Sequence, residues 1–215
     1  MVPRIGFVAL CATSFAFTSA VAQQEPVRVR GTIEQVSGSV LTVKSREGDT
    51  LNVKLADDAK VLALVKASPA DIKPGSYVGA TAMPNTDGTW WAVEVHIFPD
   101  SMRGVGLGDR AWDLKPKSTM TNGTVGVVAK NRDAAGTVGG VVAKTEGPTL
   151  TVEYQNHVEK KIGLTPDTVI VSFVPGSKDE LRPGAKIFIA AATRQGDGSL
   201  MTARINVGRD VAPPM

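Results

Sequence analysis

The side chains best suited to chemistry lie in one predicted β-hairpin. Met83, Trp90 and His96 are expected on one face of its two strands if Met83 pairs with Trp90 across the turn. A thioether, an imidazole and an indole face are groups that a soft cation such as Cu(I) uses. Met83 and His96 lie at opposite ends of the hairpin, so Met102 or Met120 would have to complete such a site. The pattern indicates either a copper-type site or an apolar contact surface.

A second group of candidates lies in residues 100–125, a segment with neither strand alternation nor a helical stripe. Arg103, Arg110, Trp112 and Asp113 are the residues of this connector that could bind a ligand. Arginine pairs with anionic groups through two hydrogen bonds, and tryptophan stacks on planar groups. In the structural alternative, Trp112 docks in a cleft between two domains and Arg110 pairs with a carboxylate. Both interpretations remain open at this point.

The sequence offers little support for nucleophilic catalysis. His96 and His157 are the only histidines, and Cys11 is the only cysteine. No nucleophile elbow of the G-x-S-x-G type and no H-E-x-x-H metalloprotease motif occurs. The Gly104–Gly108 run lacks the preceding strand, the following helix and the Lys-Ser/Thr pair of a phosphate loop. We therefore expect a protein without catalytic activity.

The elements that position these residues come in two copies. A shift of 109 positions aligns residues 29–83 with residues 138–192 without a gap, and thirteen pairs are identical. Roughly three identities would arise by chance from ordinary composition, so the duplication governs the fold prediction. The second copy lacks the distinctive hairpin set, because the counterparts of Met83, Trp90, Glu94 and His96 are Ala192, Leu200, Arg204 and Asn206. The first copy therefore has a distinct face, which also carries Tyr77.

Each copy is predicted to consist of strands. In the first copy, three alternating runs precede a capped helical turn at Ser68–Ile72, and a hairpin follows. This order matches the five-stranded OB barrel. We therefore predict an all-β fold of two tandem OB-like five-stranded barrels joined by a long ordered connector. The predicted boundaries are 23–99 for the first barrel, 100–125 for the connector, 126–208 for the second barrel and 209–215 for a flexible tail.

A shorter repeat follows the connector. The sequence of residues 123–130 nearly recurs at residues 136–144. Residues 136–144 contain the expected first strand of the second copy. We therefore expect residues 123–130 to form an extra strand that pairs with it through the intervening turn.

The first 22 residues resemble a secretory signal peptide. They contain Arg4, an apolar run too short to span a bilayer, and an A-x-A site that predicts cleavage between Ala22 and Gln23. The remaining 193 residues carry 23 basic and 21 acidic side chains, a balance that argues against nucleic acid as a partner. We expect a periplasmic or secreted monomer without a transmembrane segment.

Both copies share an early glycine in the first strand, a G-x-x-L-T-V second strand and a D/E-I/L-K/R-P-G turn. The connector from Ser101 to Asn122 has the pattern S-M-R-G-x-G-x-G-x-R-x-W-D-L-x-P-x-S-T-M-T-N. These motifs resemble those of a family of secreted bacterial proteins with tandem OB-like domains of unknown function. In the family pattern a histidine precedes the second arginine, whereas this chain has Asp109. The resemblance implies a fold and a compartment, and it implies no activity.

These observations predict an exported, non-catalytic binding or interaction module of the bacterial envelope. Its expected partner is an envelope protein or polymer, and no cofactor is expected. The interface candidates are Arg103, Arg110, Trp112, Asp113, Tyr77 and Trp90. The alternative is a periplasmic copper-type binding protein with Met83, His96 and Met102 as metal ligands.

Overall fold

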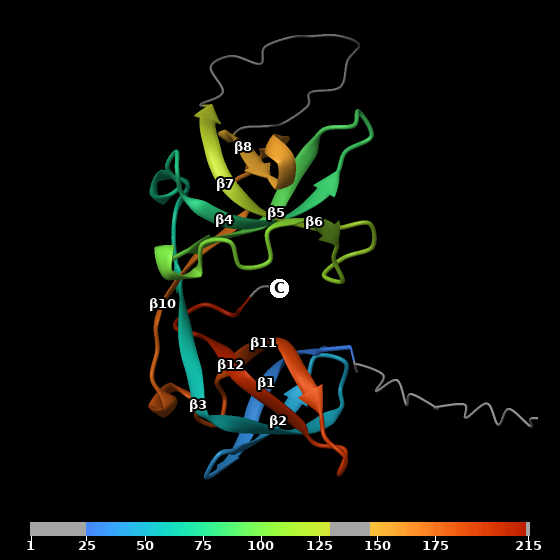
Figure 1. Ribbon diagram of the computed structural model, residues 1–215, viewed down its shortest axis with the longest axis vertical. Coiled ribbons are helices and arrows are strands. Elements are labelled where there is room, and N and C mark those ends of the chain that lie inside the picture. The colour runs from blue at the N-terminus through green and yellow to red at the C-terminus, as the bar shows by residue number, and fades with distance from the viewer. Residues whose placement is uncertain (1–24, 130–146, 214–215) are drawn as a thin grey trace, which may run out of the picture.

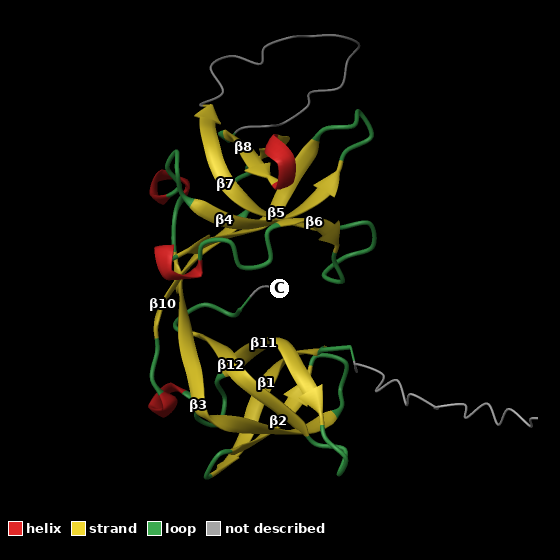
Figure 2. Cartoon of the chain, in the orientation of Figure 1, coloured by secondary structure: helices red, strands yellow, loops and turns green. Residues whose placement is uncertain are grey.

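The computed structural model describes residues 25–129 and 147–213, and this part of the chain is all-β. The predicted signal peptide and the predicted strand within residues 136–144 lie outside the described residues. Figure 2 shows strands joined by loops and single helical turns. No helix in the described ranges is long and apolar enough to cross a membrane.

The described residues form twelve strands and four short 3-10 turns. The strands are β1 (Val27–Ser37), β2 (Val40–Ser45), β3 (Thr50–Lys66), β4 (Tyr77–Pro84), β5 (Trp90–Phe98), β6 (Gly108–Ala111), β7 (Thr119–Ala129), β8 (Thr149–Tyr154), β9 (Val158–Gly163), β10 (Val169–Pro175), β11 (Lys186–Arg194) and β12 (Leu200–Gly208). The turns are η1 (Pro69–Asp71), η2 (Asp100–Met102), η3 (Gln155–His157) and η4 (Lys178–Glu180). Ser68 and Asp71 cap η1 reciprocally, which confirms the helical turn predicted there.

Five strands close into one barrel. β1 pairs with β2 and β11, β2 pairs with β3, and β12 pairs with both β3 and β11. The β3–β12 pair is parallel and the other four are antiparallel, so the barrel is mixed. Alternate side chains fill its interior, and Ile33, Leu41, Val53 and Ile205 are among those with at most 1% exposure. The all-β prediction is confirmed, and one closed five-stranded barrel is present.

The barrel takes its strands from both copies of the repeat. β1, β2 and β3 belong to the first copy, whereas β11 and β12 belong to the second. The sequence predicts instead that residues 23–99 close a barrel alone. The difference arises at β3, which runs without interruption for 17 residues. In the second copy Pro166 stands where β3 has Asp57, and the equivalent strand is split into β9 and β10.

The continuous β3 explains the exchange. It carries the chain out of the barrel before β4 and β5 can fold back onto β1. The equivalent strands β11 and β12 occupy that place instead, as happens between subunits in domain swapping. Figure 1 shows β3 and β10 running between the two halves of the molecule.

The other half consists of β4 to β9, called the second sheet below. The order in it is β5-β4-β7-β8-β9, with β6 paired to β7. β9 also meets β5 in parallel through two residue pairs, Trp90 with Ile162 and Trp91 with Gly163. An apolar core that includes Val95, Leu150 and Ile162 lies against it.

An approximate two-fold relation connects the halves. β3 and β10 pair antiparallel, and Leu64 on β3 lies opposite Phe173 on β10. These two residues are 109 positions apart, so equivalent residues of the two copies meet at the centre. The parallel β3–β12 pair in the barrel likewise matches the parallel β10–β5 pair. Faces that carry equivalent positions therefore oppose each other across the centre.

β7 takes the place that the repeat alignment assigns to residues 136–143. A Cβ on Gly31 of β1 would lie 2.2 Å from the carbonyl oxygen of Lys44, and one on Gly123 of β7 would lie 2.2 Å from that of Glu153. β7 pairs directly with β8 and β4, as β1 pairs with β2 and β11. The strand predicted to be an addition thus lies where the first strand of the second copy was expected.

Residues 209–213 pack between the halves, in contrast to the free tail that the sequence predicts. The Arg209 backbone N–H donates to the Leu64 carbonyl at 2.9 Å, and its guanidinium pairs with Glu180 at 2.8 Å. Val211 packs against the central apolar cluster around Phe173. Figure 1 shows the red segment that follows β12 between the halves.

Candidate functional site

A cavity of about 210 Å³ lies between the barrel and the second sheet. The lining residues are His96, Phe98, Met102, Val105, Gly106, Arg110, Trp112, Met120, Asn122, Phe173, Phe188, Ala190, Arg204 and Asn206. Four of them are exposed and mark its open end, namely Val105, Gly106, Ala190 and Arg204. The remaining lining residues are buried or half-buried, so the cavity extends from the surface into the centre of the molecule.

The register of the second sheet places the deep polar residues on one face. β6, β7, β4 and β5 lie side by side, so Asn122 on β7 and His96 on β5 both lie opposite Gly79 of β4. A Cβ on Gly79 would lie 2.9 Å from Asn122 Oδ1 and 3.0 Å from the Phe98 ring. A side chain at position 79 would therefore crowd the Asn122 amide and the Phe98 ring.

A β-bulge decides which residues of β5 reach the cavity. Thr81 pairs with Glu94, whereas the next residue of β4 pairs with Ala92, so Val93 is the extra residue. The bulge directs Trp90 toward the core of the second sheet and His96 toward the barrel. Trp90 and His96 therefore lie on opposite faces. The shared face predicted for Met83, Trp90 and His96 is not formed, because that prediction paired Met83 with Trp90 in an unbroken hairpin. In the structure Met83 pairs with Trp91, and Trp90 pairs with Pro84.

Glu94 and His96 form a buried pair at the inner end of the site. His96 Nε2 contacts Glu94 Oε1, and the two side chains are 4% and 1% exposed. Burial lowers the pKa of His96 to about 3. Burial also raises the pKa of Glu94 well above its usual value, and nearby Arg30 opposes this shift only in part. Both directions favour the neutral forms of the two side chains, and neither the Glu94 carboxyl oxygens nor His96 Nε2 has a hydrogen-bond partner among the described residues.

Three more buried polar atoms around the cavity have no hydrogen-bond partner among the described residues. They are Trp112 Nε1, Asn122 Oδ1 and Asn206 Oδ1. Asn206 is the counterpart of His96 in the other copy. The two-fold relation therefore brings Asn206 and His96 into one cavity. Leaving a buried polar group without a partner costs about 1–3 kcal/mol, so such atoms generally bind water or a ligand.

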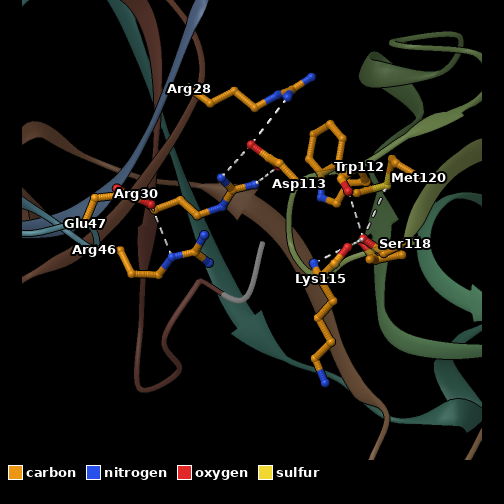
Figure 3. A network of polar contacts seen from close by, with 10 residues as sticks. Arg28, Arg30, Arg46, Glu47, Trp112, Asp113, Lys115, Ser118 and Met120 are labelled. Atoms are coloured by element: carbon orange, nitrogen blue, oxygen red, sulfur yellow. Dashed lines mark hydrogen bonds and ion pairs between the residues drawn. The ribbon is translucent and has the colours of Figure 1, made fainter.

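Trp112 and Asp113 attach the connector to the barrel. Asp113 accepts hydrogen bonds from Arg30 at 2.7 and 3.1 Å and pairs with Arg28 at 3.5 Å. The Arg28 guanidinium lies 4.3 Å from the centre of the Trp112 ring. Figure 3 shows Asp113 between the two arginines, with Trp112 beside it. Trp112 lies between the two halves, the kind of place that the structural alternative gives it. Its ring also lines the cavity.

The two connector arginines have different environments. Arg103 lies outside the cavity lining, pairs with Asp100 at 2.8 Å and donates to the Gly75 carbonyl. Arg110 lines the cavity and donates to the Gly106 carbonyl at 2.7 Å. No carboxylate of the described residues pairs with Arg110, in contrast to the pairing that the sequence suggested. Its pKa is lowered, first by burial and then by Arg28.

Tyr77 and Trp90 lie outside the cavity lining. The Tyr77 hydroxyl donates to the Val105 carbonyl at 3.0 Å, and burial raises its pKa. The Trp90 ring lies 3.6 Å from Lys160 Nζ, which also pairs with Asp109 at 3.1 Å. Asp109 occupies the position where the family pattern has histidine, and here it forms an ion pair in the second sheet.

Three soft donors line the cavity, and they differ in part from the predicted metal set. His96 and Met102 are present as predicted, Met120 is the third, and Met83 lies outside the lining. A neutral imidazole and two thioethers are suitable ligands for Cu(I). Within residues 25–129 and 147–213, no cluster of three or more His, Cys, Asp or Glu side chains could hold a metal.

Larger hollows occur on the outside of the barrel. Their volumes are about 740 and 540 Å³, and both adjoin the C-terminal residues 209–213. Exposed residues make up most of the lining of the larger one. The smaller central cavity is the stronger candidate, because the buried polar atoms without partners gather there.

The residues on the barrel side of the site were not predicted from the sequence. Phe188, Arg204 and Asn206 come from β11 and β12, which were assigned to a separate domain. The repeat alignment could have identified two of them, because it makes Arg204 and Asn206 the counterparts of Glu94 and His96. No family model, curated protein or solved structure is similar enough to this chain to count as a match.

Proposed function

We propose that this protein is an exported, non-catalytic binding protein that holds a small molecule in the central cavity. The observation that carries the proposal is the set of buried polar atoms without partners around that cavity: Trp112 Nε1, Asn122 Oδ1 and Asn206 Oδ1. Ligand sites combine apolar walls with a few placed polar groups, and this lining does the same. A volume of about 210 Å³ corresponds to about seven water molecules, which suits a small molecule better than a polymer.

A substitution at the open end tests the proposal. Ala190→Trp places an indole at the entrance, whereas Ala191→Trp changes the neighbouring exposed residue, which does not line the cavity. A ligand that binds the folded protein raises the melting temperature by mass action. We expect a panel of small organic molecules to contain compounds that raise the melting temperature of the unmodified protein and of Ala191→Trp, but not of Ala190→Trp. Equal shifts in all three proteins would contradict binding in this cavity.

A soft-metal function is the second candidate. The favouring observation is that His96, Met102 and Met120 line one cavity. Arg110 and Arg204 line it too, and their positive charges oppose a bound cation. A melting-temperature rise with Cu(I) that is lost in Met102→Leu and Met120→Leu would favour the metal over an organic ligand.

We also propose that both halves are OB-like barrels. The closed barrel has the strand order β1-β2-β3-β12-β11, in which the hairpin β11–β12 takes the place of the fourth and fifth OB strands. The second sheet has the equivalent order, with β4–β5 as that hairpin, and its two β5–β9 residue pairs support closure. Slow amide hydrogen exchange at Gly163 and its neighbours on β9 would support a second closed barrel. Rapid exchange there would indicate an open sheet.

A further inference from the structure

The charged side chains that line the central cavity are all positive. Arg110 and Arg204 are the only charged side chains that line it in the described part of the chain, and no carboxylate lines it. Neither arginine forms an ion pair with a described carboxylate. Two acidic residues of the connector are already paired elsewhere, Asp109 with Lys160 and Asp113 with Arg28 and Arg30. The entrance therefore presents positive charge that the surrounding residues leave uncompensated.

The free hydrogen-bond donors lie toward the open end. Arg204 is exposed and lies at the entrance on β12, whereas Arg110 is half-buried on β6. Arg110 uses Nη1 for the Gly106 carbonyl at 2.7 Å, which leaves other guanidinium N–H groups for a ligand. A guanidinium presents paired N–H groups at the spacing of carboxylate oxygens.

The deeper walls are apolar and aromatic. Phe98 and Phe173 stack with ring centres 5.0 Å apart, and Phe188 and Met120 are also buried. Only neutral polar groups accompany them, including the amides of Asn122 and Asn206. A ligand that reaches this depth must therefore be mostly uncharged there.

We propose that the central cavity binds a small organic monocarboxylic acid, with its carboxylate held by Arg110 and Arg204 and its apolar body among Phe98, Phe173 and Phe188. This inference rests on the proposed function and names the ligand class for the same site. The volume of about 210 Å³ accommodates a body of about seven heavy atoms, on the scale of about 30 Å³ for each water molecule in the liquid. Benzoate and 3-phenylpropanoate are suitable probes.

Each acid is compared by calorimetric titration with its neutral amide, benzamide or 3-phenylpropanamide. We expect the acids to bind at least about tenfold more tightly, because charge-assisted hydrogen bonds are roughly twice as strong as neutral ones. Arg110→Gln should weaken acid binding by about tenfold and leave amide binding unchanged. Arg204→Gln, a change at an exposed position, should act in the same direction if Arg110→Gln disturbs folding.

Arg103→Gln is the matched control, because Arg103 lies in the same connector but outside the cavity lining. Its acid affinity should equal that of the unmodified protein. Equal affinity for acid and amide would overturn the carboxylate inference but leave a cavity ligand in place. Acid binding that survives both Arg110→Gln and Arg204→Gln would also overturn it. If neither class of probe binds and the cavity holds ordered water alone, the inference and the proposed function both fail.

Discussion

At the scale of single residues, the buried pair of Glu94 and His96 links stability to pH. The unfolded chain protonates His96 below about pH 6.5, whereas the folded protein keeps it neutral down to about pH 3. The unfolded state therefore binds one more proton over this range, and His96 lowers stability as the pH falls. Glu94 acts in the opposite sense above about pH 4.5, since its folded pKa is raised. Above about pH 4.5 the two contributions therefore oppose each other.

The pair predicts a distinct acid response. Between pH 4.5 and 3 the His96 contribution stands alone, and it lowers the unfolding free energy by about 1.4 kcal/mol per pH unit. His96→Asn, which introduces the residue found at the equivalent position 206, should remove this component. Denaturant unfolding across pH 3 to 8 measures the difference between the two proteins. His157→Asn, a change at a 92% exposed side chain, should retain the original slope. An unchanged slope in His96→Asn would show that His96 is charged in the folded protein.

Asp113 provides a second test at this scale. Asp113→Asn removes the charge that holds Arg30, whose side chain is only 10% exposed. Asp113 itself is 47% exposed, so solvent screening limits the loss to about 1 kcal/mol of unfolding free energy. Thermal or denaturant unfolding measures the loss, and Glu47→Gln is the control, because the Arg46–Glu47 pair is exposed on both sides. A loss in Asp113→Asn no larger than in Glu47→Gln would contradict the anchoring role of Asp113.

At the scale of the elements, β1 and β7 each have one glycine that lies very close to the backbone of the neighbouring strand, Gly31 in β1 and Gly123 in β7. A Cβ at Gly31 or Gly123 would lie 2.2 Å from a backbone carbonyl oxygen, and a backbone atom cannot move aside as a side-chain end can. Gly31→Ala and Gly123→Ala should each reduce the unfolding free energy by about 2–3 kcal/mol. Gly126→Ala on the same β7 should be nearly neutral, since its nearest atom would lie 3.9 Å away. Equal effects at Gly123 and Gly126 would contradict the close approach of Gly123 to the Glu153 carbonyl of β8.

Strand type was predictable from the sequence, but strand partners were not. Alternating residues in the first copy predicted β1, β2, β4 and β5, and the capped turn η1 was also found where expected. The alternation of side chains does not show where a strand ends, however. It therefore did not predict that β3 continues through Asp57, whereas the equivalent strand of the second copy is split at Pro166 into β9 and β10. The Val93 bulge was equally hidden, because one extra residue moves every later side chain to the other face. Both errors affected the site, since they determine where His96 and Arg204 lie.

At the scale of the whole molecule, the exchange of β11 and β12 can be tested by crosslinking. Thr32 on β1 lies opposite Lys186 on β11, so a Thr32→Cys/Lys186→Cys pair should form a disulfide. A barrel closed within the first copy would instead bring Thr32 beside Tyr77, the counterpart of Lys186. The variants are made with Cys11→Ser, and mass spectrometry of the oxidised protein detects the bond. Efficient crosslinking of Thr32→Cys/Tyr77→Cys without the other would contradict the exchange.

The exchange also explains why the site lies at the centre. Because each copy contributes strands to both halves, faces at equivalent positions of the two copies oppose each other around the β3–β10 pair. Equivalent positions have diverged in charge, with Glu94 and His96 on one side and Arg204 and Asn206 on the other. The two copies therefore place different polar residues at equivalent positions around the cavity.

The most direct test of ligand binding at the centre is methyl NMR of the methionines. Met102 and Met120 line the cavity, whereas Met83 and Met201 lie outside its lining and serve as internal controls. With labelled methionine methyl groups, titration of benzoate should shift the signals of Met102 and Met120 and leave those of Met83 and Met201 in place. No shift with benzoate, its amide or Cu(I), or shifts confined to Met83 and Met201, would contradict a ligand site between the barrel and the second sheet.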